Sequence, residues 1–230
     1  MTEIPNLTDM LKAGVHFGHQ RSRWHPKMKP FIFGLRNGVH IIDLDKTQEE
    51  LAKALEFVKS VTAQGKVILF VGTKRQARDA TRAAAESCGM PYLVERWIGG
   101  LLTNFDEFRR RLKKYNALRE QVKTGEIEKY TKKEQVVMKK QLEKLDKYLI
   151  GLTGLEKLPD AVYIADMRTE KTALAETERT EVPTVAVCDT NTNPTKVNYP
   201  IPANDDAFKS IALITRAISE SILEGSVRYK

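Results

Sequence analysis

Apolar residues follow two patterns along this chain: short continuous runs and positions at helical spacing. Three short runs, at 67–72, 161–166 and 184–189, are almost continuously apolar and rich in β-branched residues, as is typical of strands buried on both faces. Helical patterns of apolar residues follow the first two runs, at 75–87 and at about 172–180. This alternation predicts an α/β fold with a parallel sheet, right-handed crossovers and helices on both faces.

Two further helices extend the pattern, at about 46–63 and about 205–223, each with its apolar residues on one side. Before the first of them, two strand-like runs flank Asn37 and Gly38. Asn-Gly is typical of a two-residue hairpin turn because both residues tolerate a positive φ. We therefore expect a β-hairpin in this part of the chain.

Residues 105–150 depart from this alternation of strands and helices. Aromatic and apolar residues recur there at helical spacing among many cations, and Thr131 and Glu134 then have the spacing of a capping box, which predicts the start of a second helix. That helix carries four apolar residues in steps of 4, 3 and 4, the spacing of a coiled-coil seam: Met138, Leu142, Leu145 and Leu149. A narrow seam with charged residues on the other faces indicates a helix pair that protrudes from its domain.

The predicted organisation is a single α/β domain over 1–230. Its globular part comprises 1–104 and 151–230, and 105–150 form a protruding antiparallel helical hairpin of coiled-coil type. We find no internal repeat and no low-complexity linker that would divide the chain further.

The charge is distributed unevenly along the sequence. Of the net charge of +8, residues 1–50 carry +1, 51–104 carry +4 and 105–150 carry +6, whereas 151–230 carry −3. A basic half beside an acidic half is typical of a protein that faces a polyanion, with nucleic acid the first candidate and an anionic membrane the second.

Targeting signals and cysteines narrow the class of protein. No apolar run approaches the roughly 20 residues that span a bilayer. The N-terminal MTEIPNLTDMLKAG lacks the profile of a signal peptide, so we expect a cytoplasmic protein with no membrane contact. Cys88 and Cys188 stand alone beside apolar residues, and we expect them to be reduced and buried.

The N-terminal segment offers the clearest candidate chemistry. It carries five cations, with no acid between Asp9 and Asp43: Arg21, Arg23, Lys27, Lys29 and Arg36. Trp24 and His25 add flat faces on which an unpaired base can stack. We interpret this segment as an RNA-binding loop that contacts phosphates, the alternative being a solvated basic loop with a half-buried tryptophan.

More cations lie near the first parallel strand and at the base of the hairpin. The turn after the strand at 67–72 contains Gly-Thr-Lys but lacks the P-loop and G-x-G-x-x-G patterns, so we favour phosphate contacts over a nucleotide site. A solvated helix start or a solvated helix face is the alternative at each of these positions. The predicted contacts are Lys74, Arg75, Arg78, Arg96, Arg109, Arg110, Arg111, Lys113 and Lys114.

Histidines and carboxylates raise the alternatives of a metal site and an enzyme. His16 and His19 form an i, i+3 pair without nearby thiols, and acids in later loops could complete a site in space: Asp189, Asp205 and Asp206. No histidine has a nucleophile or an orienting acid close in sequence, and no carboxylates are paired for catalysis. We therefore expect no catalytic residue, no metal ligand and no cofactor, with zinc on the histidines as the minority hypothesis.

Six long segments, in this order, carry a family resemblance: LKAGVHFGHQ, RWHPKMKPFIFGLRNGVHIIDLDKT, VGTKRQA, ERWIGGLLTNF, LPDAVYIADMRTEKTALAE and AVCDTNTNP…YPIPANDDA. From about Leu11 to Ser221 the chain resembles the bacterial ribosomal protein S2 family. This resemblance implies a flavodoxin-like fold with a coiled-coil arm and no catalysis. It also implies binding of small-subunit ribosomal RNA between head and body, late joining in assembly, and help in recruiting ribosomal protein S1. The implied partners are that RNA, S1 and neighbouring small-subunit proteins, without a small-molecule substrate.

Overall fold

A five-stranded parallel sheet forms the centre of the computed structural model, which describes residues 4–227. Its order is β5-β4-β6-β7-β8, so the first of these strands in the chain lies second in the sheet, as in flavodoxin-like folds. The strands are β4 (Ile68–Val71), β5 (Tyr92–Leu93), β6 (Ala161–Ile164), β7 (Thr184–Cys188) and β8 (Tyr199–Pro202). The predicted α/β fold is confirmed.

The two faces of the sheet belong to two separate cores. Phe70 and Tyr163 point into a core shared with α1 (Leu7–Ala13), α2 (Leu44–Thr62), α3 (Arg78–Cys88) and α7 (Phe208–Val227). Their neighbours Leu69 and Val162 point into a second core, shared with α6 (Lys171–Thr180) and the base of α4 (Phe105–Thr124). Because successive strand residues alternate between two buried faces, each strand is continuously apolar.

Two strands of the sheet were not predicted from the sequence. β5 has only two residues, too few for a recognisable pattern, and β8 contains Pro200 and Pro202. Proline lacks the N–H that a central strand must donate, but β8 lies at an edge of the sheet, where proline is tolerated.

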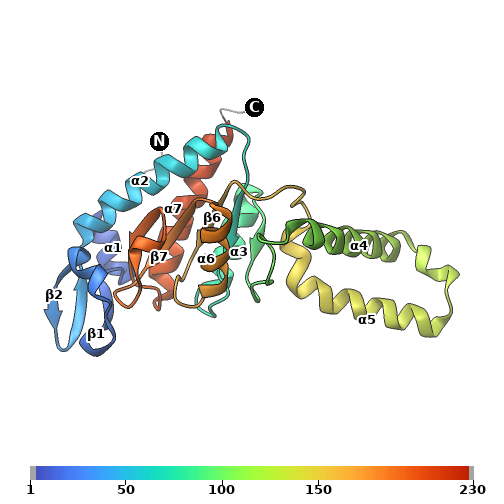
Figure 1. Ribbon diagram of the computed structural model, residues 1–230, viewed down its shortest axis with the longest axis horizontal. Helices are drawn as coiled ribbons and strands as arrows, with labels where there is room; N and C mark the ends of the chain where they lie inside the picture. Colours follow the sequence, from blue (N-terminus) through green and yellow to red (C-terminus); the bar gives the residue numbers. More distant parts are fainter. Residues whose placement is uncertain (1–3, 228–230) are drawn as a thin grey trace.

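A second, smaller sheet precedes the parallel one. It has the order β1-β3-β2 and is antiparallel, formed by β1 (Phe17–Gln20), β2 (Ile32–Arg36) and β3 (Val39–Ile42). The predicted hairpin joins β2 to β3, and Asn37 and Gly38 both have positive φ, of 50° and 78°. This sheet lies at one end of the molecule's long axis (Figure 1).

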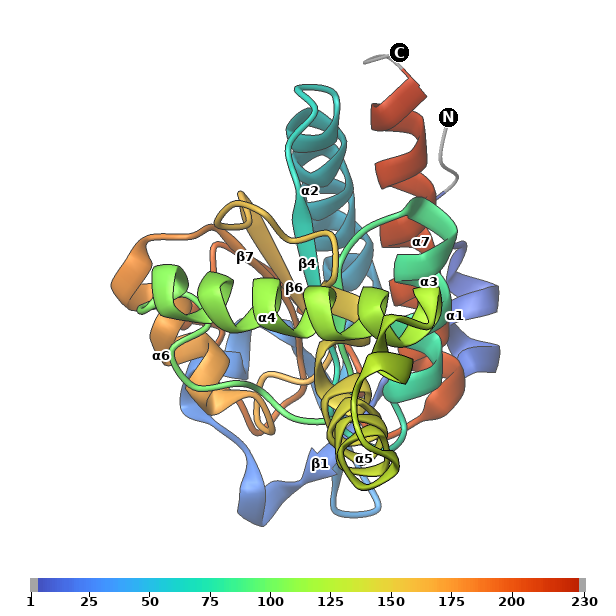
Figure 2. The ribbon, with the colours of Figure 1, turned by 90° about the vertical axis from the view of Figure 1, so that its right-hand side faces the viewer.

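A helix pair projects from the other end (Figure 1). It consists of α4, a short 3-10 turn at Glu126–Lys129, and α5 (Lys132–Leu149). The predicted capping box at Thr131 and Glu134 opens α5. In the second view α4 runs across the picture while α5 is seen nearly end-on (Figure 2). The helical hairpin is therefore present, but its two helices cross, and coiled-coil packing along the pair stays a prediction.

The domain boundaries 1–104, 105–150 and 151–230 stay a prediction. Residues 1–3 and 228–230, which this prediction includes, lie outside the described part of the chain. Among residues 4–227, no helix is long and apolar enough to cross a membrane. Cys88 and Cys188 are free thiols, half-buried and buried respectively, and burial raises the pKa of Cys188 to about 12.

Candidate RNA-binding surface

The basic N-terminal loop follows β1 as two short 3-10 helices, Arg21–Arg23 and Pro26–Phe31. Proline at the first position suits a helix start because the N–H it lacks would have no partner there. Nδ1 of His25 accepts a hydrogen bond from the Lys27 N–H at 3.2 Å and caps the second helix. Met28 is fully buried in the second core, so its side chain anchors the loop to the domain.

The loop is attached to the carboxyl edge of the parallel sheet. The backbone N–H of His25 donates to the carbonyl of Thr190 at 2.7 Å. The backbone N–H of His19 donates to the hydroxyl of Thr190 at 2.8 Å. β1 approaches so closely that a Cβ on Gly18 would lie 2.5 Å from Cγ2 of Thr190. Glycine at position 18 is therefore required for this approach.

The cations of the loop are exposed: Arg21, Arg23, Lys27 and Lys29. Among residues 4–227, no carboxylate lies within 4.0 Å of any of these four side-chain charges. Trp24 is half-buried, and its ring centroid lies 5.3 Å from that of His40. The loop therefore presents four unpaired positive charges beside an aromatic side chain, a combination suited to a nucleic-acid backbone.

A second group of cations lies beside the loop and was missed in the sequence. A cavity of about 360 Å³ is lined by His25 together with Arg168, Lys171 and Lys196, and also by Glu178. Arg168 lies in the turn before α6, Lys171 begins α6, and Lys196 ends the 3-10 turn Pro194–Lys196 before β8, so segments distant in the sequence meet around this cavity. Their sequence signal was weak because each stands alone among uncharged or acidic neighbours. They widen the basic surface around His25.

Lys74 differs from the loop cations because the protein itself neutralises its charge. Its ammonium lies 2.6 Å from Asp205, 2.8 Å from Asp206 and 3.1 Å from Asp166. Burial opposes the charge of Lys74, but these carboxylates outweigh it and raise its pKa. The structure therefore places Lys74 inside a cluster of acids and not on a surface that faces RNA.

The other predicted residues near the first strand divide in the same way. Arg78 donates to the Thr73 carbonyl at 2.9 Å and pairs with Glu95 at 3.1 Å, so contacts within the protein hold its half-exposed side chain. Arg75 and Arg96 are exposed, with no ion pair to a described residue. Of the cations predicted near the first strand, these two are exposed and have no ion pair among the described residues.

At the base of the arm the cations are exposed: Arg109, Arg110, Arg111, Lys113 and Lys114. Glu107 pairs weakly with Arg110 at 3.6 Å and with Arg111 at 3.4 Å. The separation in Figure 1 puts this group far from the N-terminal loop along the long axis. The structure thus brings together the loop and the start of α6, and keeps the arm cations as a separate patch.

Glu176 is a buried residue of α6 that the sequence analysis did not single out. Its carboxylate accepts hydrogen bonds from Trp97 Nε1 at 2.9 Å, from the Gly100 N–H at 2.8 Å and from the Leu102 N–H at 3.0 Å. Burial opposes its ionisation, yet these donors outweigh burial and lower the pKa of Glu176. Glu176 therefore holds the loop at 97–103 in place, and this loop leads into α4 at the base of the arm.

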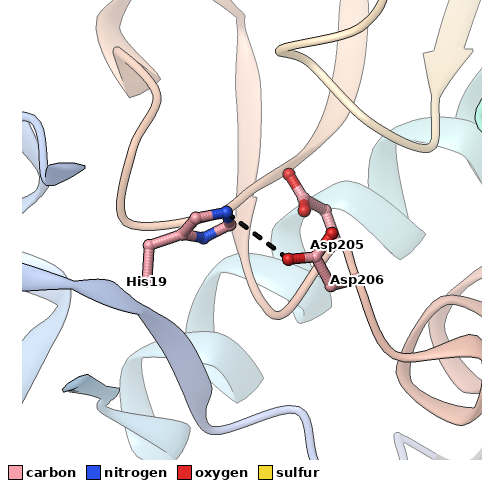
Figure 3. Close-up of side chains that lie close together, drawn as sticks. All are labelled: His19, Asp205 and Asp206. Atoms are coloured by element: carbon pink, nitrogen blue, oxygen red, sulfur yellow. Dashed lines mark ion pairs between the residues drawn. The ribbon is translucent and has the colours of Figure 1, made fainter.

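His40 is a buried histidine, whereas His19 has carboxylate partners. His40 is 9% exposed and packs against Trp24, and burial lowers its pKa. His19 has no acid close to it in the sequence, but it lies 3.0 Å from Asp189 and 3.4 Å from Asp206 (Figure 3), two of the acids in later loops. The signal for this grouping was present, because the acids follow parallel strands whose carboxyl ends share one edge.

Comparisons of the sequence with known proteins identify one family along nearly the whole chain. The family described as "Ribosomal protein S2" matches residues 10–225. The small ribosomal subunit protein uS2 of Coprothermobacter proteolyticus is 52% identical, over 96% of this chain and 83% of the relative. The proteins of the same name from Helicobacter hepaticus and Helicobacter acinonychis are 48% and 47% identical, over 97% and 95% of this chain and 85% and 89% of the relatives. The chain belongs to the ribosomal protein S2 family, whose members are structural proteins and not enzymes.

Proposed function

We propose that this member of the ribosomal protein S2 family is a structural protein of the small ribosomal subunit, that it acts in the cytoplasm, and that it binds small-subunit ribosomal RNA. The observation that supports RNA binding is the set of four unpaired, exposed cations on the N-terminal loop. Such charges gain free energy from phosphates through the release of counterions. Contacts of this kind position a protein on folded RNA and read little base sequence.

The proposed RNA contacts are the exposed cations of the basic loop and of the surface around it. Arg21, Arg23, Lys27 and Lys29 bind phosphates, and His25 connects them to the cations at the start of α6. The exposed cations at the base of the arm, with Arg75 and Arg96, form further contacts, whereas Lys74 and Arg78 form ion pairs within the protein. The position between head and body, late joining in assembly, recruitment of ribosomal protein S1 and contacts with neighbouring small-subunit proteins belong to this proposal through the family resemblance.

A nucleotide-dependent enzyme is disfavoured by the charge at the carboxyl edge of the sheet. In flavodoxin-like folds a ligand binds where β4 and β6 diverge. In this chain the Thr73 N–H at that point donates to Glu170 at 2.8 Å, and Asp166 and Asp205 surround Lys74. A phosphate group would be repelled by these carboxylates.

Incorporation into ribosomal subunits tests the proposal. The double variant Arg21→Ala, Arg23→Ala should fold normally, since both side chains are exposed, yet its share in purified small subunits should fall severalfold in competition with the wild type. The double variant Lys53→Ala, Lys66→Ala is the matched control, because it removes two exposed cations from α2 and from the opposite edge of the sheet. Equal incorporation of both variants would contradict a role of the loop in RNA binding.

A further inference from the structure

The cavity beside the basic loop lies between that loop, the start of α6 and the turn before β8. Its volume is about 360 Å³, and His25 of the loop forms part of its wall. Small-molecule sites in proteins have volumes of roughly 300–1,000 Å³, so this cavity is large enough for one nucleotide but not for an RNA helix. It lies at the carboxyl ends of β6 and β7, and its wall contains none of the carboxylates that surround Lys74.

The rim of this cavity is positively charged. Arg168, Lys171 and Lys196 are exposed, and none of them has a carboxylate of a described residue within 4.0 Å. Glu178 is the one acidic side chain among the described residues of the wall. With a neutral His25, three cations and one acid leave an excess of positive charge, which favours a phosphate group of nucleic acid.

The wall of the cavity also has an apolar part. Met167 and Leu174 are 4% and 6% exposed, and both belong to the second core. Methionine sulfur forms favourable contacts with aromatic rings, and an imidazole ring such as that of His25 is a surface on which an unpaired base can stack. The cavity therefore combines cations with apolar and flat surfaces, which are the different surroundings that the phosphate and the base of a nucleotide need.

Asn191 lies in the same wall, and its side-chain amide is unsatisfied. Its Nδ2 and Oδ1 are shielded from solvent, and neither has a hydrogen-bond partner among the described residues. A buried amide without partners costs free energy. The residue as a whole is only half-buried, and the terminal torsion of asparagine is broad, so the amide can turn toward a ligand. An amide offers a donor and an acceptor side by side, the pattern that complements the edge of a nucleobase.

We propose that this cavity binds one unpaired nucleotide of the ribosomal RNA. The base lies against Met167 and Leu174 with its edge on the amide of Asn191, and the phosphate lies among the three cations of the rim. Bases in loops and bulges of RNA are often unstacked and are bound in this way. This inference rests on the proposed function, and it adds one contact to a base where the exposed cations contact phosphates alone.

Titration of the full-length protein with adenosine 5′-monophosphate (AMP), followed by NMR, tests the cavity without ribosomal RNA. The methyl signal of Met167 and the ring signals of His25 should shift, because both residues line the cavity. AMP should bind about tenfold more tightly than ribose 5′-phosphate, which has the phosphate but no base to stack. Asn191→Leu should weaken the binding of AMP about fivefold, because leucine has a similar size but no amide. The variant should fold as stably as the wild type, since the amide has no described partner to lose.

Gln141→Leu is the matched control, since it replaces an exposed amide on α5, in the arm, by the same apolar side chain. Equal affinity for AMP and ribose 5′-phosphate would mean a phosphate site without a base and would overturn the proposal. The absence of AMP binding to the wild type would overturn it too, as would equal AMP affinity of Asn191→Leu and Gln141→Leu.

Binding of small-subunit ribosomal RNA separates this inference from the proposed function. Asn191→Leu should lower the affinity severalfold and leave its salt dependence unchanged, because no phosphate contact is lost. Arg21→Ala with Arg23→Ala should change the salt dependence itself. If only the arginine variant has its expected effect, the nucleotide cavity is wrong and the proposed function stands. If the arginine variant has no effect, the basic loop is not the RNA-binding surface, and the inference built on it is wrong as well.

Discussion

The basic N-terminal loop and the cluster around Lys74 lie at the same edge of the sheet, and both are made of residues that carry charge. In the loop, Arg21 and Arg23 face solvent without an ion pair among the described residues. In the cluster, the ammonium of Lys74 is within 3.1 Å of three carboxylates. The first group adds positive potential to the surface, and the second uses its charge within the fold.

The difference teaches that a cation in a basic stretch is available to an outside phosphate only where the fold leaves it exposed and unpaired. Lys74 and Arg75 are adjacent in the sequence, yet one is held by acids and the other is exposed. Two of the partners of Lys74, Asp205 and Asp206, come from a loop about 130 residues later in the chain, which no local pattern reveals. Three substitutions sharpen the contrast between polar groups that stabilise the fold and polar groups that do not.

Removal of the Lys74 charge should have the largest effect. Lys74→Met leaves Asp166, Asp205 and Asp206 close together without their common cation, so the free energy of unfolding should fall by about 3 kcal/mol. Urea denaturation in EDTA measures this effect. Lys27→Met is the control from the loop and should change stability by less than about 0.5 kcal/mol. Equal effects of the two substitutions would remove the distinction between the regions.

Glu176 shows a buried charge that neutral donors satisfy. Glu176→Gln leaves some of the N–H donors of Trp97, Gly100 and Leu102 with a weaker or missing acceptor, and should cost about 2 kcal/mol at pH 7. The folded protein lowers the pKa of Glu176, so its contribution is present above the usual value of 4.5 and is lost as the pH falls through the folded value. The difference between wild type and variant should therefore shrink below pH 4.5. Glu178→Gln, on the exposed face of α6, should show neither effect.

The smallest effect is expected in the arm. The hydroxyl of Tyr115 donates to Asp146 at 2.6 Å across the two helices, and the Tyr115 side chain is 1% exposed. Tyr115→Phe should cost about 1 kcal/mol, since it removes one hydrogen bond and keeps the packing. Tyr130→Phe, at a residue that is 40% exposed, is the control. A change in thermal stability that is the same for both would show that this bond does not stabilise the arm.

Much of the fold could be predicted from local pattern. The three central strands, α2, α6 and the capping box of α5 are determined by periodicity and by Thr131 and Glu134, which act within a few residues. β8 could not be predicted because its prolines argue against a strand unless its edge position is known. The seam of α5 correctly marks its less exposed side, but the crossing of α4 and α5 depends on how the base of the arm packs (Figure 2).

The candidate site was less predictable, for a physical reason. The density of cations around Arg21 and Lys27 indicated an exposed loop, and both side chains are exposed, whereas its role in RNA binding stays a prediction. The ion pairs of Lys74 and His19 join segments that meet only when the sheet is formed, and their residues had no local partner to suggest a cluster.

The salt dependence of RNA binding tests the central claim, that the loop cations contact phosphates, most directly. The measurement is the slope of log K against log salt concentration for small-subunit ribosomal RNA, compared between the wild type and Arg21→Ala, Arg23→Ala. The variant should bind more weakly, and the magnitude of its slope should be smaller by about 2, one for each lost phosphate contact. An unchanged slope would contradict the assignment of the loop as an RNA-binding surface.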